Sequence, residues 1–105
     1  MEVHSWDSMS ASEVKPGISR RTIKGERASL SYVELAPGAE SPLHQHVHEQ
    51  IDYVLEGELE FSSGSHVVVV KAGQVVVLPG CAPHRVRNVG AGVARNLGVF
   101  SPPGV

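Results

Sequence analysis

Short apolar runs separated by turn residues fill most of this chain, and that pattern limits the folds open to it. The runs are rich in Val, Ile and Leu, and breakers such as Pro37-Gly38, Glu56-Gly57 and Pro79-Gly80 stand between them. Turn signals every ~8–12 residues are typical of a β-sandwich or a β-barrel. No window carries the apolar stripe of an amphipathic helix. We therefore expect an all-β fold with strands at 18–23, 28–35, 43–46, 50–55, 59–62, 66–70, 75–78, 84–88 and 94–100.

Length and charge narrow the class further. At 105 residues the chain has room for one modest core, and we expect a flexible N-terminal arm at residues 1–12 followed by a single domain at 13–105. The net charge of −2 leaves no basic surface of the kind that binds nucleic acid or an anionic membrane. We expect neither partner.

The single cysteine and the short apolar runs indicate in which cellular compartment the protein is expected. Cys81 is the only cysteine of the sequence, so no internal disulfide is possible and a reducing compartment is the default. The longest apolar runs, 67–70 and 75–78, are strand-sized and too short to span a bilayer. Residues 1–12 contain no apolar stretch of the signal-peptide type. We expect a cytoplasmic protein.

Histidines carry the strongest chemical signal. His44 and His46 are two residues apart, so on an extended strand they project the same way and can share one ion. Gln50 follows with the same parity, and His84 belongs to a distant predicted strand. Three imidazoles and an amide oxygen make a mixed N/O site for a first-row divalent metal. His48 lies in the expected bend, where we expect a surface or supporting role.

These residues resemble the two sequence motifs of the cupin family. The spacing of Gly38, His44, His46, Gln50 and Gly57 looks like the first cupin motif, with Gln where Glu is more usual. Two motifs at matching spacings are a specific signal, whereas a lone His-x-His is weak.

The second motif is similar over Gly73, Pro79, His84 and Asn88, with Cys81 at a position usually held by Gly. The resemblance covers roughly residues 28–100. It implies a jelly-roll (double-stranded β-helix) barrel, frequent homodimers, and a metal held by His44, His46, Gln50 and His84.

Two stretches of the sequence resemble one branch of that family in particular. The segment 44–59 and the ending Phe100-Ser-Pro-Pro look like the small cupins that open an unsaturated uronate in pectin degradation, and like certain polyketide cyclases. The uronate enzymes carry an Asp at the position of Gly98 and an Arg at the position of Gly104. The resemblance therefore implies the scaffold and the metal set, but not the uronate reaction.

Other pocket residues follow from parity. Asp52 would point inward beside Gln50, and burial would raise its pKa, so it could act as a general acid or base that replaces the acid missing at Gly98; a hydrogen-bonding support role is the alternative. Tyr32 and Phe100 are expected on the pocket wall or in the core. One of the two adjacent arginines, 20 and 21, could reach a substrate carboxylate, or both could lie on a solvated strand face. Cys81 is expected at a turn near the pocket rim, as a buried thiol rather than a nucleophile.

Three functions fit this reading. The first is an enzyme that uses one divalent ion (Ni, Zn, Fe, Mn or Co) as a Lewis acid for isomerisation, cyclisation with dehydration, or lyase chemistry on a small oxygenated molecule. The second is a non-catalytic, metal-dependent module that binds or senses a small ligand, which the glycines at 98 and 104 favour. The third is an iron-dependent dioxygenase. A homodimer is expected in each case.

Overall fold

The protein is described here by a computed structural model that covers residues 1–104, so Val105, the last residue of the expected domain, lies outside the described residues. Within that range the chain forms β-strands and one short 3-10 turn, and no helix is long and apolar enough to cross a membrane. The elements are η1 (Trp6–Ser8), β1 (Ser12–Lys15), β2 (Ile18–Lys24), β3 (Ser29–Leu35), β4 (Glu49–Glu56), β5 (Glu58–Ser63), β6 (His66–Lys71), β7 (Val75–Leu78), β8 (Arg85–Asn88) and β9 (Ala94–Ser101).

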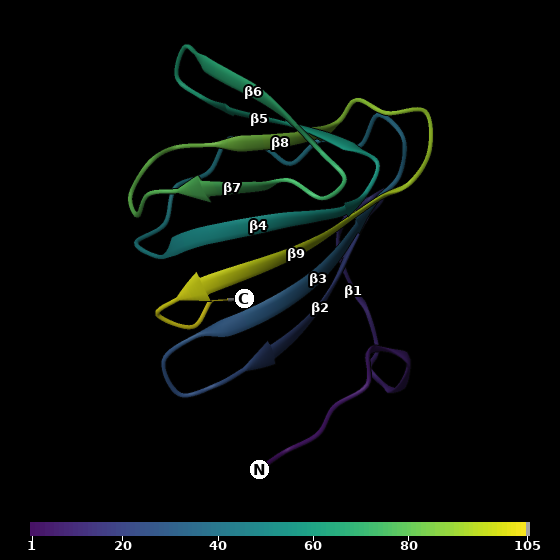
Figure 1. Cartoon of the computed structure of the whole chain (residues 1–105), viewed down its shortest axis with the longest axis vertical. Coiled ribbons are helices and arrows are strands. Elements are labelled where there is room, and N and C mark those ends of the chain that lie inside the picture. Colours follow the sequence, from purple (N-terminus) through teal and green to yellow (C-terminus); the bar gives the residue numbers. More distant parts are fainter. Residues whose placement is uncertain (105) are drawn as a thin grey trace.

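The strands form two antiparallel sheets (Figure 1). The larger has six strands in the order β1-β2-β3-β9-β4-β7, and the smaller has three in the order β6-β5-β8. In Figure 1 the smaller sheet lies at the top, and the larger continues below it toward the N-terminus. Neighbours distant in sequence, such as β3 with β9 and β5 with β8, give the wound topology of a jelly roll. The all-β prediction is confirmed.

Alternation along each strand builds the core. On β4 the side chains of Gln50, Asp52 and Val54 are buried, whereas Ile51 and Tyr53 are exposed. Side chains two residues apart on a strand share a face, so one set of positions is turned inward. The buried apolar residues of both sheets meet in one cluster, formed by Ile18, Leu35, Val54, Leu59, Phe61, Val70, Leu78 and Ala94.

Two segments differ from the strands expected from the sequence, apart from shifts of one residue at several strand ends. Residues 43–46 do not form a strand, because only His44 pairs there, in an isolated bridge with His84. Pro42 precedes this segment and has no N–H to donate to a ladder. At the other end of the chain, β1 begins at Ser12 and pairs with β2 across the Pro16-Gly17 turn.

Candidate metal centre

Backbone pairing brings His44 and His84 face to face. The N–H of His44 donates to the carbonyl of His84 at 3.0 Å, and the N–H of His84 donates back to His44 at 2.9 Å. His46 follows two residues later, and its carbonyl accepts the N–H of Cys81 at 2.7 Å. Backbone hydrogen bonds therefore join the loop before β4 to the loop before β8. One ligand atom from each of these three histidines lies within 4.8 Å of the other two.

The hydrogen bond made by Nδ1 of each of the three histidine rings fixes the tautomer of that ring. Nδ1 of His44 lies 2.9 Å from the carbonyl of Pro42, Nδ1 of His46 lies 3.1 Å from the carbonyl of His48, and Nδ1 of His84 lies 3.0 Å from the carbonyl of Ala82. A carbonyl oxygen only accepts, so each Nδ1 carries the hydrogen and donates it. Each Nε2 then keeps its lone pair, which is the form that binds a metal.

His84 is the most enclosed of the three rings. Its side chain is 1% exposed, and its Nε2 has no hydrogen-bond partner among the described residues. Burial lowers the pKa of His84 and the nearby His44 and His46 lower it further, although the hydrogen bond to Ala82 acts in the opposite direction. The ring is therefore kept neutral near pH 7, as a metal ligand must be.

Gln50 adds an oxygen to the cluster. Its Nε2 donates to Oδ2 of Asp52 at 2.6 Å, which orients the amide and turns Oε1 toward His46. Oε1 lies 3.1 Å from Nε2 of His46. Both atoms carry lone pairs in the tautomer described above, so a cation between them would relieve their repulsion. Two atoms each about 2.1 Å from one ion are about 3 Å apart when they bind it at right angles.

Asp52 is held by two amides. Asn96 Nδ2 donates to Oδ1 at 2.7 Å, and Gln50 holds Oδ2. Burial raises the pKa of Asp52 to about 6, although the hydrogen bonds from Asn96 and Gln50 and the electrostatic influence of the nearby His46 ring act to lower it. A carboxyl group with a pKa near neutrality can exchange a proton at physiological pH.

Gly98 leaves the space that this carboxylate fills. Asp52 on β4 is directly opposite Gly98 on β9. A Cβ atom at Gly98 would lie 2.9 Å from Oδ1 of Asp52 and 3.2 Å from Cε2 of Phe100. Asp52 thus places its acid against the position where the resembling uronate enzymes carry theirs.

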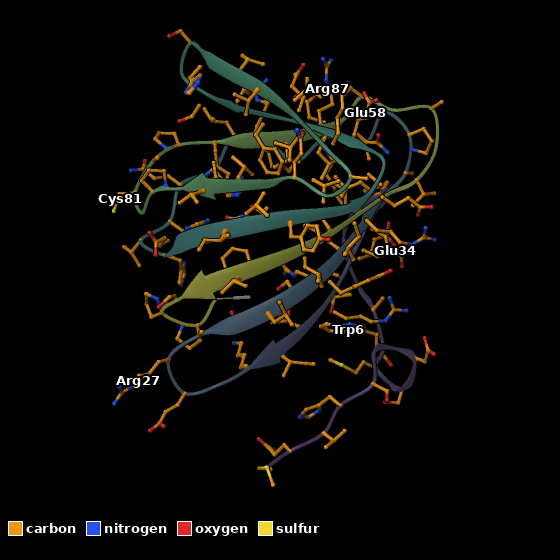
Figure 2. All side chains as sticks on the ribbon, in the orientation of Figure 1. Trp6, Arg27, Glu34, Glu58, Cys81 and Arg87 are labelled. Atoms are coloured by element: carbon orange, nitrogen blue, oxygen red, sulfur yellow. The ribbon has the colours of Figure 1, made fainter. Side chains whose placement is uncertain are left out.

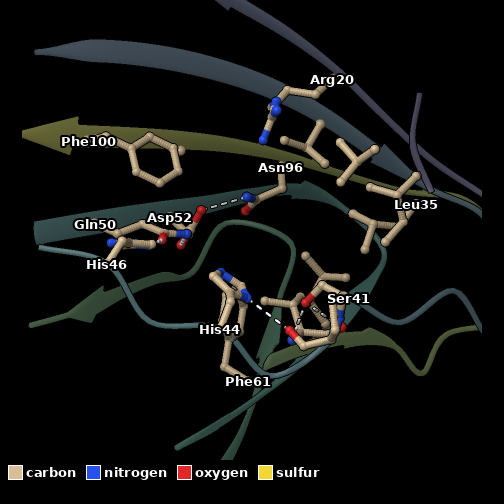
Figure 3. Close-up of a pocket in the computed structure, with 17 residues that line it drawn as sticks. Arg20, Leu35, Ser41, His44, His46, Gln50, Asp52, Phe61, Asn96 and Phe100 are labelled. Carbon is tan, nitrogen blue, oxygen red and sulfur yellow. Dashed lines mark hydrogen bonds between the residues drawn. The ribbon is translucent and has the colours of Figure 1, made fainter. Parts of the chain in front are cut away.

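Apart from His84, these groups line part of a cavity of about 310 Å³. The rest of its wall is mainly apolar, with Ile18, Val33, Leu59 and Phe61 among the contributors. Figure 3 shows Phe100 and the Gln50–Asp52–Asn96 chain along one wall, with His44 and His46 toward the loop side. A mostly apolar cavity with a few convergent polar groups is the usual form of a small-molecule site.

Other predicted residues lie elsewhere. Tyr32, which the sequence analysis placed on the pocket wall or in the core, lies on the outer face of β3 with its ring centroid 5.4 Å from that of Trp6. Its parity on the strand is opposite to that of Val33, which lines the cavity. His48 packs beside His46 and Phe100 rather than joining the cluster. Cys81, which was expected to be buried, is exposed at the turn between β7 and β8 (Figure 2).

From the sequence, Asn96 was missed, and Arg20 was named only as one of two adjacent arginines that could reach a substrate carboxylate. Asn96 is buried and supports Asp52, and Arg20 lines the cavity from β2. Neither belongs to a motif, so spacing alone gave no signal. Strand parity could have found them, because Asn96 shares a face with Phe100, and Arg20 shares one with buried Ile18.

Three inward Nε2 atoms, one of them buried without a partner, fit a divalent metal ion. His44, His46 and His84 would hold it, and the oxygen of Gln50 is placed to join them. The donor set of imidazole nitrogens suits zinc, nickel, iron, manganese or cobalt alike, so it does not select the metal.

A two-sheet antiparallel barrel with convergent histidines beside its cavity defines a metal-site jelly roll. The model of the family described as Cupin domain matches residues 31–100, and the chain therefore belongs to the cupin family.

Individual relatives agree with this assignment. A Methanocaldococcus jannaschii protein named MJ1618 and described as uncharacterized is 31% identical over 81 residues, which are 76% of this chain and 65% of that protein, so the chain spans about two thirds of its length. KdgF from Halomonas sp. superposes with a TM-score of 0.89 at 24% identity, covering 97% of this chain and 94% of that one. The polyketide cyclase RemF from Streptomyces resistomycificus superposes with a TM-score of 0.84 at 22% identity, covering 96% and 79%.

Proposed function

We propose that this cupin is a metal-dependent enzyme that acts on a small, oxygenated, anionic molecule by isomerisation, cyclisation with dehydration, or lyase chemistry. The observation that carries the proposal is the position of the buried acid Asp52 in the same cavity as His44 and His46, whose ring nitrogens converge with that of His84. The bound ion would supply a Lewis acid that polarises a substrate oxygen. The resemblance to uronate-opening and polyketide-cyclase cupins supports this reaction class.

The chain's own groups would position the substrate and move its proton. Oδ1 of Asp52 accepts one hydrogen bond, from Asn96, and keeps a second lone pair at which it can take up or release a proton. Gln50 and Asn96 hold the carboxylate in place, so no reorientation is needed before proton transfer. The apolar wall excludes water from the rest of the substrate.

The metal set is tested by elemental analysis of protein purified without added metal. We expect about one divalent ion per chain in the wild-type protein, and we expect the His84→Ala variant to lose it. His66→Ala is the matched control, because His66 is exposed at the start of β6. A protein that contains no metal, and takes none up, would exclude the proposal. Redox-active iron would instead favour the dioxygenase alternative.

A non-catalytic binding module is the second candidate, and Gly98 and Gly104 are the observations that favour it. The enzyme and the binding module can be distinguished by adding an unsaturated uronate and following its consumption by NMR. Turnover that is lost in Asp52→Asn supports the enzyme, and unaltered turnover in that variant would remove Asp52 from the mechanism. Binding by the metal-loaded protein without turnover would support the binding module.

Two further proposals concern the surroundings of the protein. We propose a homodimer, because the family resemblance implies one and the outer face of the larger sheet exposes apolar side chains. A cytoplasmic location is proposed from the single cysteine alone.

A further inference from the structure

Arg20 directs a positive charge into the cavity from the wall formed by β2. It lines the same cavity as Asp52, Asn96, His44 and His46. In Figure 3 its guanidinium reaches from the strand toward Asn96. Arg21, the next residue, has the opposite parity and lies on the outer face of the sheet. The two adjacent arginines are therefore separated by the sheet itself.

The two arginines also differ in their partners. Arg21 donates to the carbonyl of Met9 at 3.1 Å and lies 3.4 Å from the carboxylate of Glu34. The guanidinium of Arg20, by contrast, has no hydrogen bond or ion pair within residues 1–104. A guanidinium stays charged at any ordinary pH, and a cation beside apolar walls is costly unless water or an anion satisfies it.

Neither strand that flanks Arg20 places a carboxylate directly opposite it. Its cross-strand neighbours are Ser12 on β1 and Val33 on β3. Across the sheet, the next residue in line after Val33 is Asn96 on β9. Asp52, the acid of this cavity, already accepts hydrogen bonds at both oxygens.

Beside Arg20 stands a second unsatisfied group. Oδ1 of Asn96 is buried and has no hydrogen-bond partner among the described residues, because the amide nitrogen is committed to Asp52. A buried acceptor without a donor costs about 1–3 kcal/mol, so a bound hydroxyl or amine would be stabilised there. The cavity therefore presents a fork of N–H donors and one free acceptor on the same wall.

We propose that Arg20 binds the carboxylate of the ligand and that Asn96 accepts a hydrogen bond from a hydroxyl next to it. The ligand class is a small hydroxycarboxylic acid with an apolar body. This inference rests on the proposed function, since it names the substrate group that the same cavity recognises. A phosphate is disfavoured, because a single guanidinium would face a dianion on a wall that also carries Asp52.

Mandelate, phenylacetate and mandelamide are suitable probes. They share a phenyl ring but differ in the carboxylate and the hydroxyl. Binding to the full-length protein is measured by NMR titration after treatment with EDTA and again after loading with zinc. We expect mandelate to bind at least about tenfold more tightly than mandelamide and more tightly than phenylacetate, and to shift the Nε–Hε resonance of Arg20.

Arg20→Gln tests the residue directly. We expect about a tenfold loss of mandelate affinity with no change for mandelamide, and a smaller loss in Arg20→Lys, which keeps the charge but not the fork. Arg27→Gln is the matched control, because Arg27 is exposed in the β2–β3 turn and points away from the body of the protein in Figure 2. It removes the same charge outside the cavity.

Equal binding of mandelate and mandelamide, unchanged mandelate affinity in Arg20→Gln, or no binding of either probe would overturn the inference. The EDTA-treated sample makes this result independent of the metal. A protein that binds mandelate through Arg20 but contains no metal would contradict the proposed function alone, whereas a metal-loaded protein indifferent to Arg20 would contradict this inference alone.

Discussion

The buried carboxylate of Asp52 links the stability of the metal-free protein to pH. Between pH 3.8 and about 6 the folded chain keeps a proton on Asp52 that the unfolded chain has released. The unfolding free energy contributed by this group therefore falls as pH rises through that window. From the raised pKa, the loss is about 3 kcal/mol.

The prediction is measured by urea unfolding of the EDTA-treated protein at pH 4 and pH 7, compared with Asp52→Asn. His84 acts in the opposite direction, because its lowered pKa adds stability as pH rises. Both proteins contain His84, so the difference between their curves isolates Asp52. We expect the wild type to lose about 2.4 kcal/mol relative to the variant over this interval, because part of the full loss has already occurred at pH 4. Parallel curves would contradict the raised pKa.

Asn96 makes Asp52→Asn a mild variant. A neutral amide at position 52 offers one acceptor, which Gln50 can still use. Rotating the amide of Asn96 would bring its free Oδ1 toward the new N–H₂ group. We therefore expect the variant to fold.

Cys81 carries backbone strain that a single substitution can relieve. Its φ of 65° lies in the left-handed region, where a Cβ costs roughly 1–2 kcal/mol. Cys81→Gly removes the Cβ but makes the unfolded chain more flexible. We expect a net gain of about 0.5–1 kcal/mol in the free energy of unfolding. Cys81→Ala keeps the Cβ and should show no gain, so a glycine variant less stable than the alanine variant would contradict the explanation.

At the scale of elements, β4 and β9 are coupled through the pair Asp52 and Gly98. The side chain of Asp52 fills the space above Gly98, and its Oδ1 would lie only 2.9 Å from a Cβ built at Gly98. We expect Gly98→Ala to destabilise the fold by about 1–3 kcal/mol, since the added methyl group displaces the buried side chains of Asp52 and Phe100. The measurement is urea unfolding.

A double-mutant cycle isolates this coupling. In an Asp52→Gly background the alanine at position 98 has room, so we expect its cost to fall by at least about 1 kcal/mol. Gly92→Ala serves as the control, because a Cβ there meets no atom within 4 Å. Additive effects of the two substitutions would show that they do not share the space.

Sequence patterns predicted most of the strands, because inward and outward positions alternate with burial. The same alternation placed Gln50 and Asp52 in the interior correctly. It did not predict the isolated bridge between His44 and His84, because a bridge of one residue pair has no periodicity. The acceptor left free on Asn96 and the unpaired charge of Arg20 depend on which side chains meet across the sheet. Sequence spacing along one strand does not contain that information.

The whole molecule leaves one apolar face uncovered. The outer side of β7, β4 and β9 exposes a contiguous set in which Ile51 pairs with Val77 and with Val99, and Tyr53 pairs with Val75. These side chains are 37–57% exposed. Contiguous apolar patches of this kind commonly mark protein interfaces. A second copy of the chain is the partner that the proposed homodimer places there.

We therefore expect Val77→Lys to shift the protein from dimer to monomer in analytical ultracentrifugation, because a lysine in the centre of an apolar interface loses its hydration. Val69→Lys makes the same chemical change on β6 of the smaller sheet, where Val69 is 47% exposed. It should leave the dimer intact. Dissociation by Val69→Lys alone would place the interface on the smaller sheet.

The tight contact between Asp52 and Gly98 also restricts how such a site can evolve. An acid on either strand fits, but acids on both would collide and repel each other at a separation below van der Waals contact. A lineage that moves the acid from one strand to the other is therefore penalised at an intermediate that carries both. Each arrangement resists conversion into the other, even though the change needs only two substitutions.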